Sequence, residues 1–256
     1  MTLVQKEPKS IKIWTTDIKK VYLGTTQVRP VVPPIPYLCF TAEEANSKVL
    51  FGKSGSPTAV TLEYSTDKNT WQTYTFSSFI TLVNVWDKVY FRNSSDTPTW
   101  FSVSSSHKYN CYLTGKVAAS GDITSLLCKN LTTTLTADYC FVELFADVTA
   151  LTSAPSLPAT TITTGCYMDM FIRCTNLTTL PALPATTLKN YCYYEMFYWC
   201  SKIYLSTGTY SNQYRIPTTW TWTDTNNTMT DMFRNTWWTV RTPSINTTYY
   251  TSNTVA

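Results

Sequence analysis

The chain has 256 residues, of which 43% are hydrophobic and 15% aromatic, and this is enough apolar side chain to bury a large core. Only 14% are charged, and the formal net charge of +4 includes no basic run, which excludes the electrostatic footprint expected of a nucleic-acid-binding protein. No apolar segment reaches the roughly 18 residues of a membrane span, and the N-terminus lacks the apolar region of a secretory signal. We therefore expect a chain that is made in the cytoplasm and stays there or leaves by lysis.

Residues 1–29 are predicted to form a small β module. The stretches IKIW, KKVYLG and TTQV alternate in polarity and are separated by turn residues. Their apolar side chains are too few to build a core and are therefore predicted to dock on a partner: Ile11, Ile13, Val21, Tyr22 and Leu23. Residues 30–36 contain four prolines, which favour an extended linker.

Residues 37–116 are predicted to form an antiparallel β-sandwich domain. Seven apolar and aromatic stretches, YLCFTA, KVLFG, AVTLEYS, TYTF, ITLVNV, KVYFRN and FSVSS, follow one another with turn residues between them. Short strands with regular turn signals are typical of sandwiches and barrels.

Residues 117–256 contain a repeat of 26 residues, seen when Leu151 is aligned with Leu177, Cys166 with Cys192 and Phe171 with Phe197. Tandem units of this length predict a solenoid. In one unit, LTTLPAL is predicted to be a strand and ATTLKNYCYYEMFYWC a helix that begins at a threonine cap. The expected fold class is therefore multi-domain α+β, with a leucine-rich-repeat-like solenoid at the C-terminal end.

Spacing also predicts the core of the repeats. Cys192, Met196 and Cys200 lie four residues apart and would share one helix face, as would the equivalent residues 166, 170 and 174. With Phe145, Phe171 and Phe197 they are predicted to form ladders of apolar side chains inside the stack.

Residues that carry chemistry are sparse. The single histidine, His107, is predicted to lie in an exposed turn, and the eight cysteines follow the repeat and are predicted to be buried thiols. Glu143, Asp169 and Glu195 recur at one position of three units, where they form either a solvated row or a site for a cation or a basic partner. No nucleotide-binding or nucleophile motif occurs. We expect no catalytic residue, no metal site and no cofactor, so the protein is not expected to be an enzyme.

The repeats resemble a known family. LPATT, CYYEMF and the cysteine-rich ends of the units resemble the BspA-like leucine-rich repeats of bacterial surface proteins, and YLCFTAEEANS with LEYSTDKNTWQTYT and DKVYFRN resembles the β-domain that often precedes them. The N-terminal IKKVYLGTTQVRP resembles a short module at the head of phage and prophage proteins. The resemblance extends from Tyr37 onward for the two larger parts, and it implies adhesion or surface display rather than catalysis.

Seven tryptophans depart from this resemblance, because they stand where members of the family carry glycine. One hypothesis is that the gene reads a reassigned stop codon as glycine, which is written here as tryptophan; the alternative is a genuine aromatic-rich surface. The positions are Trp86, Trp100, Trp199, Trp220, Trp222, Trp237 and Trp238.

Equivalent positions of the repeats supply the candidate binding surface. Thr152, Thr178 and Lys202 are predicted on the strands, and Tyr193 and Tyr194 on the helices. Threonine and tyrosine suit a glycan or a protein partner, although the tyrosines could equally belong to the core.

The function that these observations favour is a non-enzymatic, virion-associated structural or adhesion protein: a phage head or tail fibre or a decoration protein. Its N-terminal module would bind other virion proteins, and its repeats would bind a protein or glycan of the host surface. We expect a homo-oligomer, a trimer by analogy with fibres, on the virion surface, with no nucleic-acid or membrane partner. The alternative is a bacterial cell-surface adhesin. A glycan-degrading enzyme is a remote third class, because no pair of facing carboxylates can be nominated.

Overall fold

A computed structural model describes residues 21–23, 26–28, 35–203, 205–206, 212–215, 228–236 and 248–251. The chain divides into two compact units, Met1–Ile35 and Pro36–Ala256. In the first unit, β1 (Val21–Leu23) pairs with β2 (Thr26–Val28) as an antiparallel hairpin, with Val21 opposite Val28. The predicted strand at IKIW lies outside the described residues.

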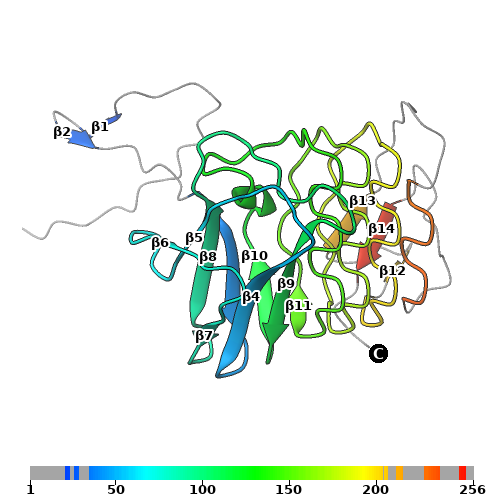
Figure 1. The fold of residues 1–256 in the computed structure, drawn as a ribbon, viewed down its shortest axis with the longest axis horizontal. Coiled ribbons are helices and arrows are strands. Elements are labelled where there is room, and N and C mark those ends of the chain that lie inside the picture. The colour runs from blue at the N-terminus through cyan, green and yellow to red at the C-terminus, as the bar shows by residue number, and fades with distance from the viewer. Residues whose placement is uncertain are drawn as a thin grey trace, which may run out of the picture. The chain divides into compact units, whose positions relative to one another are not determined.

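The second unit begins with a six-stranded sheet in the order β11-β10-β3-β8-β5-β6 (Figure 1). All neighbours are antiparallel except β10 and β11, which run parallel. The strands are β3 (Leu38–Ala42), β5 (Leu62–Ser65), β6 (Gln72–Thr73), β8 (Lys88–Asn93), β10 (Val117–Ser120) and β11 (Leu151–Ser153).

A second, three-stranded sheet has the order β7-β4-β9 and consists of β7 (Ile80–Leu82), β4 (Ser47–Ser54) and β9 (Lys108–Thr114). Side chains from the two sheets meet in one core, since the ring of Phe51 on β4 lies 4.9 Å from that of Phe91 on β8 and 6.1 Å from that of Phe40 on β3. Burial alternates along β8 as expected for a strand with one face in the core. A third sheet joins β12 (Leu205–Ser206), β14 (Thr248–Thr251) and β13 (Asn212–Arg215).

Three strand predictions for residues 37–116 differ from the structure. The predicted strand TYTF is not formed as such, because β6 overlaps it only at Thr73. The stretch FSVSS forms no strand beyond an isolated bridge between Ser104 and His107, because Phe101 turns into the core and stacks on Tyr109 at 4.5 Å. Strand β9 was not among the predicted strands. Its sequence KYNCYLT alternates, and it forms the longest ladder of the smaller sheet, seven residue pairs with β4.

The predicted helices of the repeats are absent. Among the described residues the only helix is a short 3₁₀ helix, Ile123–Leu126, so none could cross a membrane. The expected α+β class is therefore wrong: the described chain is built from strands and turns. Each expected helix is instead a run of consecutive β-turns, here called a turn segment, at residues 139–148, 165–174, 191–200 and 228–236.

Backbone geometry explains why a turn segment is not a helix. Every fourth residue has a positive φ, between 46° and 63°, which interrupts the α-helical conformation. In the third segment these residues are Tyr191, Glu195 and Trp199. Each turn is closed by a bond of the i to i+3 type, such as Leu144 N–H to the carbonyl of Phe141 at 3.3 Å.

The remaining N–H groups of a turn segment point to the next unit. Phe141 N–H donates to the carbonyl of Cys166 at 2.9 Å, and Tyr167 N–H donates to Cys192 at 3.1 Å. Half of the backbone donors are thus satisfied only because a neighbouring unit lies beside them. On the other side, Cys111 N–H of β9 donates to the carbonyl of Leu144 at 2.7 Å, so the first turn segment is bonded to the smaller sheet.

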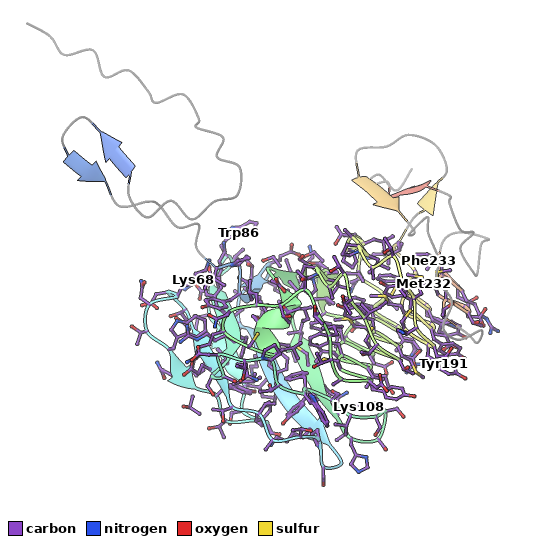
Figure 2. All side chains as sticks on the ribbon, turned by 90° about the horizontal axis from the view of Figure 1, so that it is seen from above. Lys68, Trp86, Lys108, Tyr191, Met232 and Phe233 are labelled. Carbon is purple, nitrogen blue, oxygen red and sulfur yellow. The ribbon has the colours of Figure 1, made fainter. Side chains whose placement is uncertain are left out.

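The predicted core of the repeats is confirmed. Phe145, Phe171, Phe197 and Phe233 stack in parallel with ring centroids 5.4, 5.4 and 5.5 Å apart. The cysteines and methionines of both predicted stripes are fully buried. A period of four residues turns the same side chains inward in a turn segment as in a helix, so the spacing is correct although the helix is not. Figure 2 labels Met232 and Phe233 at the last unit of this stack.

The repeats and the two sheets share one core without a break at residue 116. Strand β10 pairs with β3 on one side and with β11 of the first repeat on the other. Beyond β11 the stack continues through bonds such as Thr178 N–H to the carbonyl of Thr152 at 3.1 Å, although the predicted strand LTTLPAL is not formed. This continuity brings residues of the sheet and of three repeats to one surface.

Candidate functional site

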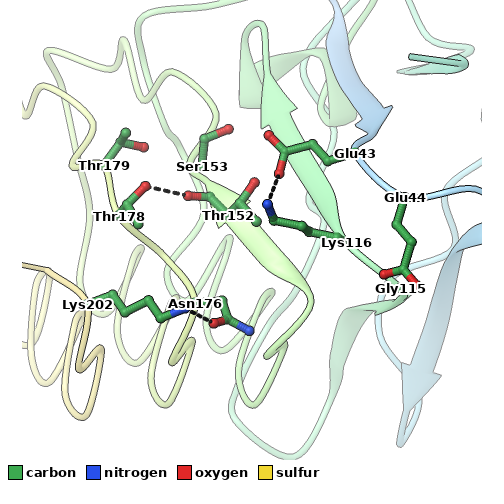
Figure 3. Close-up of a pocket in the computed structure, with 10 residues that line it drawn as sticks. All are labelled: Glu43, Glu44, Gly115, Lys116, Thr152, Ser153, Asn176, Thr178, Thr179 and Lys202. Carbon is green, nitrogen blue, oxygen red and sulfur yellow. Dashed lines mark hydrogen bonds and ion pairs between the residues drawn. The ribbon is translucent and has the colours of Figure 1, made fainter. Parts of the chain in front are cut away.

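An open groove of about 670 Å³ lies where the sheet continues into the repeats (Figure 3). It crosses the ends of β10 and β11 and the two units that follow. The groove is lined only by polar residues and one glycine: Glu43, Glu44, Gly115, Lys116, Thr152, Ser153, Asn176, Thr178, Thr179 and Lys202.

The repeat builds this groove by placing equivalent residues side by side. Asn176 and Lys202 are 26 residues apart, as are Thr152 and Thr178, and Ser153 is equivalent to Thr179. Because strands and stacked units turn alternate side chains to opposite faces, the leucines next to these residues enter the core while the polar side chains face the groove.

Hydrogen bonds to the backbone hold the hydroxyl groups in place. Thr152 Oγ1 donates to the carbonyl of Val117 at 3.2 Å, Ser153 Oγ to Ala119 at 2.7 Å, and Thr178 Oγ1 to Thr152 at 3.0 Å. Each hydroxyl has then used its only proton, so it offers lone pairs to the groove. The lining is therefore a fixed array of hydrogen-bond acceptors.

Charges in the groove balance. Lys116 Nζ lies 3.5 Å from the carboxylate of Glu43, and Lys202 Nζ donates to Oδ1 of Asn176 at 2.6 Å. With Glu44 the groove contains two lysines and two glutamates, so its formal charge is zero. This balance does not favour a strongly ionic ligand. It favours a neutral ligand with many hydrogen-bond donors.

Of the residues predicted from sequence, Thr152, Thr178 and Lys202 come together in the groove. Asn176, Ser153 and Thr179 were not predicted, although the 26-residue register places each of them at or beside a predicted position. Glu43 and Glu44 were not predicted either. No local pattern indicates these two acidic residues, because they come from the turn between β3 and β4.

The two predicted tyrosines do not belong to this groove. Tyr193 is buried, with 1% of its surface exposed, and stacks on Tyr167 at 6.0 Å, so its prediction as a contact residue is corrected to a core residue. Tyr194 is half-buried on the turn segment. Of the predicted anchor residues, Val21, Tyr22 and Leu23 form β1, and Ile11 and Ile13 lie outside the described residues.

A second polar feature is the acidic row. Glu143, Asp169, Glu195 and Asp231 occupy one position of successive turn segments, all with positive φ. Burial, followed by the neighbouring charges of Glu195 and Glu143, raises the pKa of Asp169 to about 7. Glu143 forms an ion pair with Lys108, and Asp231 pairs with Arg234 at 3.1 Å. Ion pairs therefore neutralise the two ends of the row, at Glu143 and Asp231. Asp169, between them, has no ion pair and is repelled by the charges of Glu143 and Glu195.

The thiols are arranged for packing. All eight cysteines are buried and unpaired with one another, and burial raises the pKa of Cys140 and of Cys192 to about 12. Cys174 and Cys200 donate S–H bonds to the carbonyls of Phe145 and Phe171 at 2.9 and 3.0 Å. His107 lies in an exposed turn, as predicted. The described residues contain no group of three metal-ligating side chains.

Two of the seven tryptophans that depart from the resemblance have a positive φ, a backbone conformation that favours glycine. Trp86 has φ of 73° and Trp199 has φ of 62°, and their side chains are 71% and 49% exposed. Trp100 is also exposed, at the rim of a smaller hollow. In contrast Trp71, which is not anomalous, packs under the guanidinium of Arg92 at 3.9 Å. The other four positions lie outside the described residues, and the intact mass of the natural protein would distinguish glycine from tryptophan.

Comparison of the chain with protein-family models, with curated proteins and with solved structures finds no match. The functional interpretation therefore rests on the residues and geometry of this chain.

Proposed function

We propose that the protein is a non-enzymatic structural and adhesion protein of a virion, and that the groove binds a hydroxyl-rich glycan of the host surface. The observation that carries the proposal is the array of backbone-anchored acceptors in a groove of zero formal charge. Sugar hydroxyl and acetamido groups supply the donors that such an array requires.

The repeat adds a geometric reason. Successive units are stacked with aromatic rings 5.4 to 5.5 Å apart in the core, and equivalent groove residues such as Thr152 and Thr178 recur once per unit. This ring spacing is close to the length of one pyranose residue in an extended chain. A linear oligosaccharide that lies along the stack would meet one set of equivalent acceptors per sugar, which is how repeat proteins recognise extended ligands.

A glycan array probed with the full chain tests the proposal. We expect binding to neutral oligosaccharides that is lost in a variant with Thr178→Val and Asn176→Ala, because the first removes an acceptor and the second opens the bond that positions Lys202. The matched control is Lys88→Ala on β8, an exposed position outside the groove, which should leave binding unchanged.

Two results would contradict the proposal. The first is the absence of glycan binding by the full chain, and the second is equal binding by the groove variant and the control variant. Circular dichroism of each variant separates a lost ligand contact from a lost fold.

The virion assignment rests on the resemblance of the N-terminal module. A bacterial surface adhesin remains the alternative, and the two differ in where the protein is found. Immunogold labelling of purified particles and of intact cells distinguishes them: label on particles supports the virion protein, and label on the cell envelope alone supports the adhesin. Sedimentation equilibrium tests the expected trimer.

A further inference from the structure

One turn segment differs from the others in the side chains that it turns outward. The third segment presents Tyr191, Tyr194 and Tyr198, here called the aromatic face. The positions equivalent to Tyr194 are Val142, Met168 and Thr230, and those equivalent to Tyr198 are Ala146, Ile172 and Arg234. The position equivalent to Tyr191 carries Tyr139 in the first segment and Gly165 in the second. The stack therefore folds without aromatic residues at the positions of Tyr194 and Tyr198, and these two tyrosines exceed what packing requires.

The rings of the aromatic face are ordered but remain accessible. Tyr191 and Tyr194 meet edge to face at 5.7 Å, and Tyr198 lies under the guanidinium of Arg234 at 5.5 Å. All three are half-buried, and Tyr191 lies at the outer edge of the stack in Figure 2. Trp199, 49% exposed, borders Tyr198 at 6.2 Å, but the three tyrosines form the face without it. Rigid, half-exposed tyrosines are typical of protein contact surfaces.

The charge beside the aromatic face is negative. Glu195 lies between Tyr194 and Tyr198 in sequence and accepts a hydrogen bond from the hydroxyl of Tyr194. Asp169 flanks it on the preceding unit, but its carboxyl group is partly buried and its pKa is raised to about 7, so Glu195 supplies the accessible negative charge. Glu195 forms no ion pair with a described residue. Basic side chains nearby are already engaged: Arg173 with Asp147 and Arg234 with Asp231. Aromatic rings and free carboxylates together attract cationic side chains.

The chain itself contains a segment of the matching charge. Residues 1–29 contain six basic and two acidic residues, so they carry the whole formal net charge of +4 while the rest of the chain is neutral. The basic residues are Lys6, Lys9, Lys12, Lys19, Lys20 and Arg29. Prolines 30, 33, 34 and 36 follow at once, and a run of this kind favours an extended, semi-rigid spacer.

We propose that the aromatic face, with Glu195, binds the basic segment 1–29 of a second copy of the chain. The result is head-to-tail association, in which each copy uses its N-terminal segment on the repeats of the next. Such heterologous contacts close into a ring or continue as a filament according to the rotation between copies. The proposal is independent of the glycan groove, which lies on a different set of residues.

Sedimentation velocity of the full chain over a concentration series, at low and at high salt, tests this association. We expect larger species at higher concentration, and a weaker association at high salt because the contact is ionic. Glu195→Lys should raise the dissociation constant about tenfold or more, as should the pair Lys19→Glu and Lys20→Glu. A variant that combines all three changes should associate again, because the charges are exchanged.

The matched control is Asp96→Lys, the same reversal at an exposed position after β8, which should leave association unchanged. A synthetic peptide of residues 1–29 should dissolve the assemblies of the unaltered chain, and this measurement remains available if Glu195→Lys fails to fold. Three results would overturn the proposal: a monomer at every concentration, association unaffected by the three changes, or no recovery in the combined variant. Binding of sugars lost in Glu195→Lys, without self-association, would assign the face to a glycan instead.

Discussion

Replacement of Asp169 by asparagine tests the electrostatics of the acidic row. The carboxyl lies half-buried between Glu143 and Glu195, and its Oδ1 has no hydrogen-bond partner in the described structure. Its pKa is about 7 in the folded chain against 3.8 for the ordinary side chain. Asp169→Asn keeps the shape and the polarity of the side chain but removes its charge at every pH.

The magnitude follows from the pKa difference. Each pKa unit corresponds to about 1.4 kcal/mol, so a shift of this size has an upper limit of roughly 4 kcal/mol, and residual solvent contact and relaxation reduce the expected value to about 2 kcal/mol. Because the folded pKa is raised, the contribution of Asp169 to stability is fully present below about pH 4 and is lost as the pH rises to about 7. Asp169→Asn should therefore match the unaltered chain near pH 4 and exceed its stability above pH 7.

Urea unfolding at several pH values between 4 and 8, followed by circular dichroism, measures this difference. Asp96→Asn, at an exposed position away from the row, is the control and should change the free energy of unfolding by less than about 0.5 kcal/mol at each pH. A difference between Asp169→Asn and the unaltered chain that stays constant with pH would refute the assignment of a raised pKa. A variant that is less stable above pH 7 would show that the charge of Asp169 is needed.

Four further outcomes are expected. Phe171→Ala, which interrupts the phenylalanine ladder between rings 5.4 Å away on either side, should lower the free energy of unfolding by about 3–5 kcal/mol in urea titrations; a loss below 1 kcal/mol would show that the ladder adds little. Trp199→Gly should raise the free energy of unfolding by about 1 kcal/mol, because the backbone φ of 62° favours glycine; a less stable variant would contradict that reasoning. All eight thiols should resist a thiol reagent in the folded chain and react in urea, and fast reaction of the native chain would contradict their burial. Deletion of residues 1–29 should leave the melting transition of the remainder unchanged while association is lost, since residues 36–256 form a separate compact unit; a lower melting temperature would place the segment in the core.

Two surfaces of the chain depend on the repeat in different ways. The groove uses positions that are similar in successive units, such as Thr152 and Thr178, and so extends along the stack. The aromatic face includes two positions, those of Tyr194 and Tyr198, at which one unit differs from the others, and so it marks a single place on the stack. The repeated positions of the groove suit an extended ligand, and the aromatic face, which occurs on one unit, suits a single partner segment.

Part of the groove could be predicted because the repeat aligns equivalent residues. Thr152, Thr178 and Lys202 follow from the register alone. Glu43, Glu44 and Lys116 could not be predicted in this way, because they come from the sheet and reach the groove only through the pairing of β10 with β3 and β11. Tyr193 shows the converse. Its chemistry suits a surface, but the inward stack that begins with Phe141 and Tyr167 places it in the core.

The sequence by itself determined the period of the repeat and the side chains that enter the core, since a hydrophobic residue must be buried whichever backbone carries it. The choice between a helix and a turn segment was decided only by tertiary structure. A spacing of four residues buries Cys192, Met196 and Cys200 in either conformation. A helix satisfies its backbone donors internally, whereas a turn segment leaves half of them for the neighbouring unit, as in Phe171 N–H to Met196 at 3.0 Å. A turn segment is stable only when a neighbouring unit lies beside it, and therefore the sequence of one unit alone does not indicate it.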